Sequence, residues 1–201
     1  MTDSTSSNNK LQGKVAIVTG GASSMGEATA LEFAAHGARA IVIADVQGEK
    51  GQNVAVSIGS NVCSYVHCDV SDEEQVKNLV DSTVKSCGRL DIIVLDLDLA
   101  AYDKLMAVNA RGMAACVKHA VLGLVRIRVN CVSPGLVGTP LLKDMLGYEN
   151  EEEDKVVEST YTLKGRLMRP KNVADAVVFL ASEDSQFVTG HDLVVDGGHR
   201  G

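Results

Sequence analysis

A glycine-rich turn between an apolar strand and a helix constrains this chain more than any other feature. Lys14–Thr19 (KVAIVT) is a short apolar run rich in branched residues and predicts a buried strand. Gly20–Gly26 predicts the turn, and the spacing of apolar residues in Glu27–His36 predicts a helix. Glycines let backbone amides approach a pyrophosphate, which the N-terminus of a helix attracts. The turn therefore indicates a dinucleotide site, whose candidate residues are Gly20, Ser24, Met25 and Gly26.

Strand-like and helix-like segments alternate along most of the chain. The composition suits buried parallel strands covered by helices, since aromatic residues are only 3% and Ala, Val, Ile and Leu dominate. The sequence therefore predicts an α/β fold, a doubly wound, Rossmann-like parallel sheet with right-handed crossovers. The expected strands are Ala40–Ala44, Cys63–Cys68, Leu90–Val94, Ile127–Val132 and Leu193–Val195. The expected helices are Glu49–Ser57, a helix capped by Ser71 that runs to about Ser86, Leu99–His119 and Asn172–Ala181.

Asp45 ends the second expected strand, 25 residues after Gly20. A carboxylate at this place can accept both ribose hydroxyls of NAD and repel the additional phosphate of NADP. The alternative is an aspartate that caps a helix or is simply solvated. The position favours the cofactor role, so we expect NAD as the cofactor.

Charge and composition exclude several classes of function. A formal net charge of −7 disfavours nonspecific binding to nucleic acids or anionic membranes, because phosphate contact needs clustered Lys and Arg. Residues 1–10 (MTDSTSSNNK) are polar and predict a disordered tail rather than a signal peptide. Residues 11–201 are expected to form a single dinucleotide-binding domain, and the default location is the cytoplasm.

The cysteines and histidines indicate no metal site. The five cysteines form no CxxC pair, and their odd number suits free thiols in a reducing compartment. The five histidines are scattered, without the clustered His and Cys ligands that a zinc site needs. We expect packing or surface roles for both residue types.

Six motifs, in order, carry a resemblance to a known family. The chain resembles the single-domain short-chain dehydrogenase/reductases, and among them the plant members that oxidise terpenoid, lignan or similar secondary alcohols. The resemblance extends from Leu11 to Gly198. Its motifs are GKVAIVTGG at 13–21, IVIAD at 41–45, CDV at 68–70, MAVNARG at 106–112, RVNCVSPGLVGTP at 128–140 and VTGHDLVVDGG at 188–198.

The resemblance implies roles for further residues. Asp69 and Val70 would line the adenine pocket, and Asn109 would be the catalytic asparagine that holds a water in the proton relay. The alternative for Asn109 is an ordinary polar residue of a helix. The residues that would flank the nicotinamide are Pro134, Gly135, Val137 and Thr139.

The chain also departs from the family pattern. Ser24 stands where the family has the middle glycine of its turn. The family's Asn-Ala-Gly segment is missing after Ile93, and Val121–Val125 resembles a fragment of the helix that should begin with the catalytic tyrosine and lysine. No tyrosine has a lysine four residues later: the four are Tyr65, Tyr102, Tyr148 and Tyr161. The gaps fall between recognisable pieces, which indicates internal deletion from a normal sequence.

These departures set the functional expectation. The resemblance implies an NAD-dependent oxidoreductase by descent, for a secondary alcohol or ketone, and we expect its catalysis to be impaired because the serine, tyrosine and lysine of the catalytic set are missing. One central strand and most of one helix are expected to be absent, which would damage the homo-oligomer interface of the family. The alternatives are a noncatalytic nucleotide-binding or subunit-interaction protein, or a nonfunctional shortened isoform.

Overall fold

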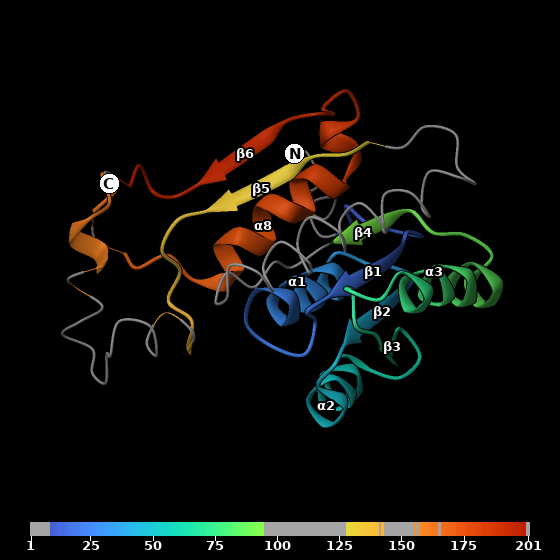
Figure 1. Ribbon diagram of the computed structural model, residues 1–201. Coiled ribbons are helices and arrows are strands. Elements are labelled where there is room, and N and C mark those ends of the chain that lie inside the picture. Colours follow the sequence, from blue (N-terminus) through green and yellow to red (C-terminus); the bar gives the residue numbers. More distant parts are fainter. Residues whose placement is uncertain are drawn as a thin grey trace, which may run out of the picture. The chain divides into compact units, whose positions relative to one another are not determined.

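The computed structural model describes residues 9–94, 128–140, 142, 155, 157–164 and 166–199 (Figure 1). The chain forms two compact units, Met1–Ile127 and Arg128–Gly201, and each is described by itself. The expected Leu99–His119 helix, Asn109 within it and the predicted loss of a strand and a helix lie outside the described residues. The extent of the expected single domain, residues 11–201, stays a prediction.

The first unit contains a parallel sheet with the strand order β3-β2-β1-β4. Its strands are β1 (Val15–Thr19), β2 (Ala40–Asp45), β3 (Cys63–His67) and β4 (Ile92–Val94). Ile17 in β1 aligns with Val42 on one side and with Ile93 on the other. The chain first moves outward from β1 to β3 and then returns to β4 on the other side of β1. This reversal makes a doubly wound sheet and confirms the predicted fold class.

Three helices connect these strands: α1 (Ser24–Ala35), α2 (Gly48–Ile58) and α3 (Glu73–Cys87). The predicted cap of α3 is wrong by one residue. Asp72, rather than Ser71, is the N-cap, because its carboxylate accepts hydrogen bonds from the amides of Glu74 and Gln75. Gly88 ends the helix with a left-handed backbone, φ 75°. The helix α1 begins three residues earlier than predicted, directly inside the glycine-rich turn.

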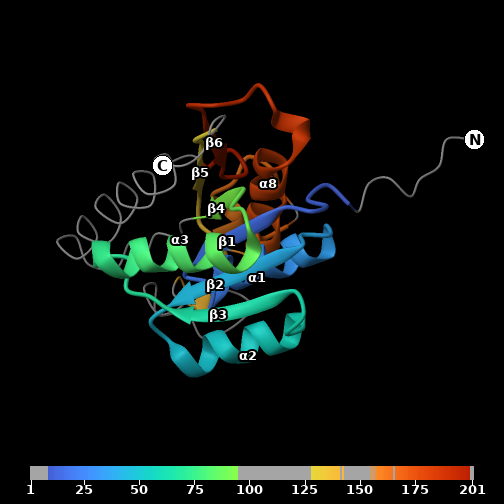
Figure 2. The ribbon, with the colours of Figure 1, turned by 90° about the vertical axis from the view of Figure 1, so that its right-hand side faces the viewer.

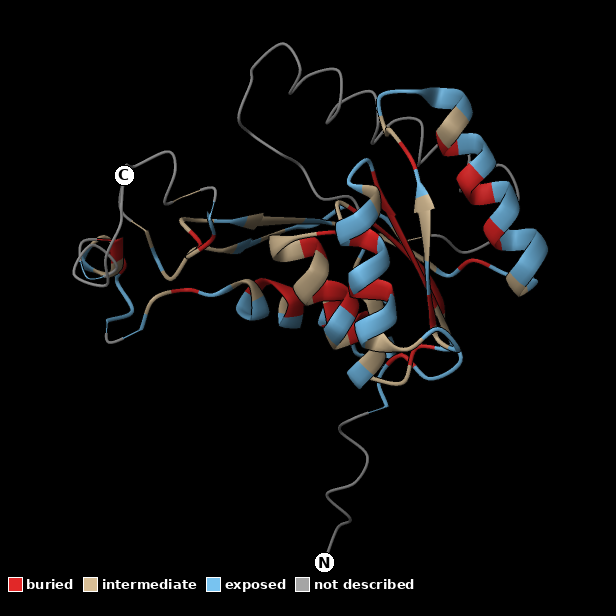
Figure 3. Cartoon of the chain, turned by 90° about the horizontal axis from the view of Figure 1, so that it is seen from below, coloured by how far each residue is buried: buried red, intermediate tan, exposed pale blue. Residues whose placement is uncertain are grey.

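The core of the first unit lies on both faces of the sheet. Every residue of β1 is buried, as expected for a strand covered on both sides (Figure 3). Side chains alternate along a strand, so Val15 and Ile17 share one face with Val42. Val76 and Leu79 of α3 pack against that face, and α3 lies beside β1 in Figure 2. The opposite face is covered by α1 and α2. The crossovers from β1 to β2 and from β2 to β3 run in one direction along the sheet and the crossover from β3 to β4 runs in the reverse direction, so right-handed connections place α1 and α2 on the face opposite to α3.

The named elements among the described residues of the second unit are two parallel strands, an α-helix and a short 3-10 helix. These are β5 (Cys131–Pro134), α8 (Pro170–Ala181), η3 (Glu183–Ser185) and β6 (Asp192–Val195). The strand predicted at Ile127–Val132 is therefore displaced toward the C-terminus, since pairing with β6 sets its bounds. Arg128 precedes the strand, and its guanidinium donates to the carbonyls of Ser182 and Val188 and to the hydroxyl of Ser185. These bonds tie the entry of β5 to the segment after α8.

The described cysteines are all free thiols: Cys63, Cys68, Cys87 and Cys131. Burial raises the pKa of the Cys63 and Cys68 thiols to about 11, so both are protonated and unreactive near neutral pH. Within the described residues, no helix is both long enough and apolar enough to cross a membrane.

Candidate dinucleotide-binding site

The geometry of the turn after β1 favours glycine at three positions. Gly20 has a positive φ of 64°, and its amide donates to the carbonyl of Ala44 at the end of β2 (2.9 Å). A Cβ atom at Gly26 would lie 2.3 Å from the carbonyl oxygen of Gly20, and one at Gly21 would lie 2.9 Å from Cγ2 of Ile43. The first turn of α1 therefore lies directly against the end of β1. This packing leaves backbone amides at the N-terminus of α1, where an anionic group is attracted.

Asp45 ends β2 beside this turn and is 7% exposed. Its Oδ2 accepts a hydrogen bond from the amide of Ala22 (3.1 Å), and its Oδ1 accepts one from the amide of Gln47 (2.9 Å). The reading as a solvated aspartate is therefore wrong, and the N-cap of α2 is Gln47. Each carboxylate oxygen has a second lone pair. Asp45 thus holds the glycine-rich turn and retains acceptor capacity for a ligand hydroxyl.

Asp69 and Val70 follow β3 at the same edge of the sheet, because the carboxyl ends of parallel strands lie together. The Asp69 carboxylate accepts from the amide (2.9 Å) and the hydroxyl (2.6 Å) of Ser71. The backbone amide of Asp69 donates to Oε1 of Gln75 (3.0 Å). Val70 is half-buried against the core. The structure thus places the candidates of the first unit at one edge: Gly20, Ser24, Met25, Gly26, Asp45, Asp69 and Val70.

This edge contains a topological switch point of the sheet. The connections from β1 lead to β2 on one side, and β4 lies on the other side of β1. Ligands of doubly wound sheets bind outside the carboxyl ends of the strands where the direction of winding reverses. The glycine-rich turn follows β1 and thus lies at that point.

Ser24 takes a backbone conformation that favours glycine. Its φ is 51°, and it is the single non-glycine residue with a positive φ in the described ranges. A side chain in the left-handed region costs roughly 1 kcal/mol, because its Cβ approaches the following carbonyl. Ser23, directly before it, has an extended backbone with φ −162°, and its side chain makes no capping hydrogen bond. The departure from the glycine pattern therefore has a conformational cost at Ser24 and none at the adjacent Ser23.

The remaining cofactor candidates lie in the second unit, in the loop after β5. We call residues 134–139 the β5 loop. The amide of Gly135 donates to the carbonyl of Val195 (3.0 Å), and that of Gly138 to the carbonyl of Met168 (2.9 Å). Val137 and Thr139 are both buried. The structure thus brings Pro134, Gly135, Val137 and Thr139 into one loop at the carboxyl end of a parallel strand.

Two tyrosines contribute contacts that the sequence did not indicate. The Tyr65 hydroxyl donates to the carbonyl of Asp45 (2.7 Å), and the Tyr161 hydroxyl donates to the carbonyl of Leu136. Tyr65 lies in β3, which pairs with β2. The signal in the sequence that could have indicated its contact with Asp45 is a tyrosine in the strand that follows β2. Tyr161 gives no such signal, because it joins segments 25 residues apart.

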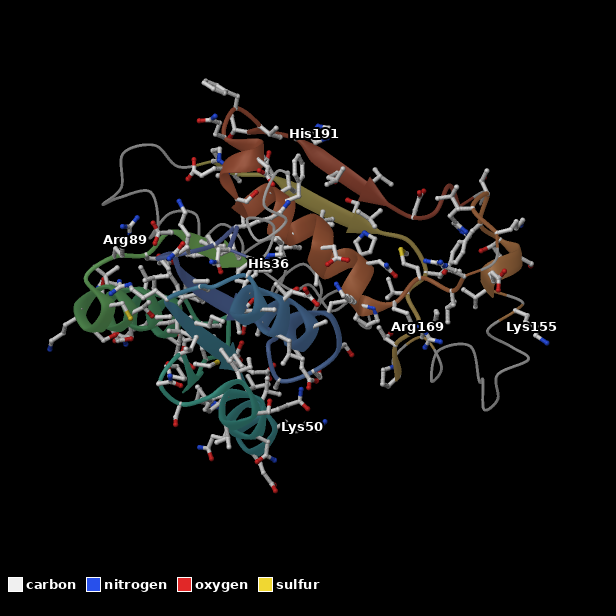
Figure 4. The ribbon with its side chains drawn as sticks, turned by 180° about the vertical axis from the view of Figure 1, so that it is seen from behind. His36, Lys50, Arg89, Lys155, Arg169 and His191 are labelled. Atoms are coloured by element: carbon white, nitrogen blue, oxygen red, sulfur yellow. The ribbon has the colours of Figure 1, made fainter. Side chains whose placement is uncertain are left out.

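The described histidines take part in neither group of candidates. His36 follows α1 and His191 precedes β6 (Figure 4). Nε2 of His36 lies 3.9 Å from the carboxylate of Glu32, one helical turn earlier. No group of three or more His, Cys, Asp or Glu side chains within the described ranges could hold a metal ion.

Two family models match the chain. The model described as "short chain dehydrogenase" matches residues 14–126, more than half of the chain, and the one described as "Enoyl-(Acyl carrier protein) reductase" matches residues 120–200. A solved structure of a "Short-chain dehydrogenase/reductase SDR:Glucose/ribitol dehydrogenase" from Brucella melitensis has a TM-score of 0.84 at 21% identity. The structural match extends over 98% of that chain and 95% of this one, which supports the fold.

Curated plant proteins are similar along nearly the whole chain. A (+)-cis,trans-nepetalactol synthase of Nepeta racemosa is 44% identical, with 94% of this chain and 92% of the relative covered. A mitochondrial (-)-isopiperitenol/(-)-carveol dehydrogenase of Mentha piperita is 46% identical, with 94% of both covered. Secoisolariciresinol dehydrogenase of Forsythia intermedia is 36% identical, with 94% of this chain and 90% of the relative covered.

The strain at Ser24 predicts a stabilising substitution. Ser24→Gly removes the clash of the Cβ atom and is expected to stabilise the protein by about 0.5–1 kcal/mol, or a few °C in Tm. Ser23→Gly is the matched control. Ser23 has an unstrained, extended backbone in the folded protein, so this substitution relieves no strain and only increases the conformational freedom of the unfolded chain. Thermal unfolding of the three proteins gives the comparison. A Tm for Ser24→Gly at or below that of Ser23→Gly would contradict the assigned strain.

Proposed function

Because the chain belongs to the short-chain dehydrogenase/reductase family of oxidoreductases, we propose that it binds NAD and has lost most of the family's hydride-transfer chemistry. The observation that carries the binding proposal is the buried Asp45 carboxylate beside the glycine-rich turn. The ancestral reaction is the oxidation of a secondary alcohol, or the reduction of its ketone, with a terpenoid-like substrate. Two of the relatives are named as dehydrogenases: the one from Mentha of (-)-isopiperitenol and (-)-carveol, and the one from Forsythia of secoisolariciresinol.

The residues of the first unit fit the adenosine and pyrophosphate parts of a dinucleotide. The close approach of Gly26 to Gly20 leaves no side chain between the turn and a ligand at the N-terminus of α1. Asp45 offers free lone pairs to ribose hydroxyls, with Asp69 and Val70 at the adenine end. In the second unit we assign Pro134, Gly135, Val137 and Thr139 to the nicotinamide end. When bound, the nicotinamide would accept or supply the hydride.

The charges near Asp45 favour NAD over NADP. The additional ribose phosphate of NADP would be repelled by a buried carboxylate beside it, and it would need a cation to compensate. The guanidinium of Arg39 is engaged elsewhere, since it donates to the carbonyl of Cys87 (2.6 Å). Lys50 in the first turn of α2 donates to Oε1 of Gln47 (2.8 Å), so its ammonium group lies near the start of this helix. Lys50 is exposed, so solvent screens its charge more than that of Asp45.

The described tyrosines do not supply a catalytic base. Alcohol oxidation needs a group that takes the hydroxyl proton as the hydride leaves. Burial and, second, the charge of Asp45 raise the pKa of the Tyr65 hydroxyl, which is the wrong direction for a tyrosinate base. Tyr161 is buried with its hydroxyl on a backbone carbonyl. Tyr102, Tyr148 and Asn109, the proposed catalytic asparagine, lie outside the described residues.

The lengths of the alignments support an internal loss of sequence. The alignment with the nepetalactol synthase extends over 250 positions, whereas 94% of this 201-residue chain is about 189 residues. About 60 positions of the relative therefore have no counterpart here. A loss of this size accommodates the missing strand and helix and, with them, the serine, tyrosine and lysine.

A noncatalytic nucleotide-binding or subunit-interaction protein is the second candidate function. The specific observation in its favour is that the buried Asp45 carboxylate lies beside the glycine-rich turn, while no described tyrosine is suited to act as a base. We further propose a cytoplasmic location and a damaged homo-oligomer interface. The relative from Mentha is described as mitochondrial.

The preference for NAD is tested by calorimetry with NAD and NADP. We expect NAD to bind more tightly than NADP, and Asp45→Ala to weaken NAD, because it removes the acceptor for the ribose and the bond that holds Ala22. Lys50→Ala is the charge control and is expected to leave NAD affinity unchanged. Equal or tighter binding of NADP by the unmutated protein would refute the assignment of Asp45.

The loss of chemistry is tested by assaying alcohol-dependent NADH production with carveol. We expect a rate at least about four powers of ten below an intact family member, because the members of a catalytic set act together. The Mentha dehydrogenase, assayed in parallel, is the positive control. Production of NADH at the rate of that control, abolished by Asn109→Ala, would show that the chain remains an active dehydrogenase.

A further inference from the structure

Tyr161 connects the β5 loop to a segment far along the chain. The residue is 2% exposed, and its hydroxyl donates to the carbonyl of Leu136 in the middle of the loop. Buried hydroxyls are held by their hydrogen-bond partners, because an unpaired one is costly. The bond therefore fixes the loop at a point between its attachments at Gly135 and Gly138.

The ring of Tyr161 is itself held by the C-terminal turn. The amides of Thr162 and Leu163 donate to the carbonyls of Gly198 (3.1 Å) and Gly197 (2.9 Å). A Cβ atom at Gly197 would lie 3.3 Å from the Tyr161 ring, so the ring rests directly on that backbone. His199 contacts the ring edge-on, with centroids 6.5 Å apart. The position of the hydroxyl is thus set by the packing of residues 160–163 against residues 197–199.

We propose that Tyr161 is a positioning residue for the nicotinamide end of the cofactor, an inference that rests on the proposed NAD site. A trans peptide is planar, so a fixed Leu136 carbonyl also fixes the direction of the Val137 amide. That amide donates to no acceptor in the part of the chain that the structure describes. Val137 is buried, and a buried amide needs a partner. The bond from Tyr161 therefore presents the Val137 amide to an acceptor on the bound cofactor.

The hydroxyl of Tyr161 should contribute to the affinity for NAD and not to the affinity for ADP-ribose, which lacks the nicotinamide. We expect Tyr161→Phe to weaken NAD by about 3- to 10-fold, the effect of losing one hydrogen bond that orients a ligand group. ADP-ribose should bind the variant as it binds the unmutated protein. A purely structural role of Tyr161 would instead weaken both ligands equally.

Calorimetric titration of both ligands decides the matter. The matched control is Ser57→Ala, which removes a hydroxyl that donates to the carbonyl of Val54 (2.8 Å) in α2 and takes no part in the contacts of Tyr161 or of the β5 loop. It should change neither affinity. Unchanged NAD affinity in Tyr161→Phe, or equal weakening of the two ligands, would overturn the positioning role. Failure of the unmutated protein to bind either ligand would overturn the NAD site and this inference with it.

A second variant keeps the test decisive should Tyr161→Phe fail to fold, as monitored by thermal melting. His199→Ala removes the edge-on contact that restrains the ring and leaves the hydroxyl in place. We expect selective weakening of NAD, in the same direction as in Tyr161→Phe. Identical NAD and ADP-ribose affinities in His199→Ala and the unmutated protein would contradict the proposed restraint.

Discussion

The hydrogen bond from the Ala22 amide to the Asp45 carboxylate joins the end of β2 to the glycine-rich turn, and the candidate site depends on it. A buried carboxylate is costly unless it is hydrogen-bonded, and the amides of Ala22 and Gln47 satisfy it from two sides. The same bond fixes the turn and, through Gly26, the start of α1. One side chain thus holds both of the places that we propose for the ribose and the pyrophosphate of a dinucleotide.

The sequence predicted the first unit closely because its signals are local. Branched apolar runs and alternating helices specify β1 to β4, and the position of Asp45 follows from the length of β2. The start of α3 was misplaced because Ser71 and Asp72 are both good caps, and geometry decides between them. The bounds of β5 were misplaced because pairing with β6 sets them. The contact of Tyr161 with Leu136 joins distant segments and leaves no periodic signal.

Binding and chemistry place different demands on this chain. The parts that we propose to bind a dinucleotide are turns at the ends of strands, held by backbone hydrogen bonds and by glycines that exclude side chains. The chemistry of the family needs a tyrosine, lysine and serine in one constellation, and the sequence contains no tyrosine with a lysine four residues later. Internal losses of sequence can therefore remove catalysis while the proposed binding turns remain. Ser24 adds a conformational cost to one of those turns.

The central proposal, that this chain binds NAD, is tested most directly by hydrogen exchange with and without NAD. The account predicts that saturating NAD slows amide exchange in residues 20–26 and in residues 134–139 of the same sample. ADP-ribose should slow exchange in residues 20–26 alone. Protection by NAD that is confined to residues 20–26, or absent from both segments, would contradict the account.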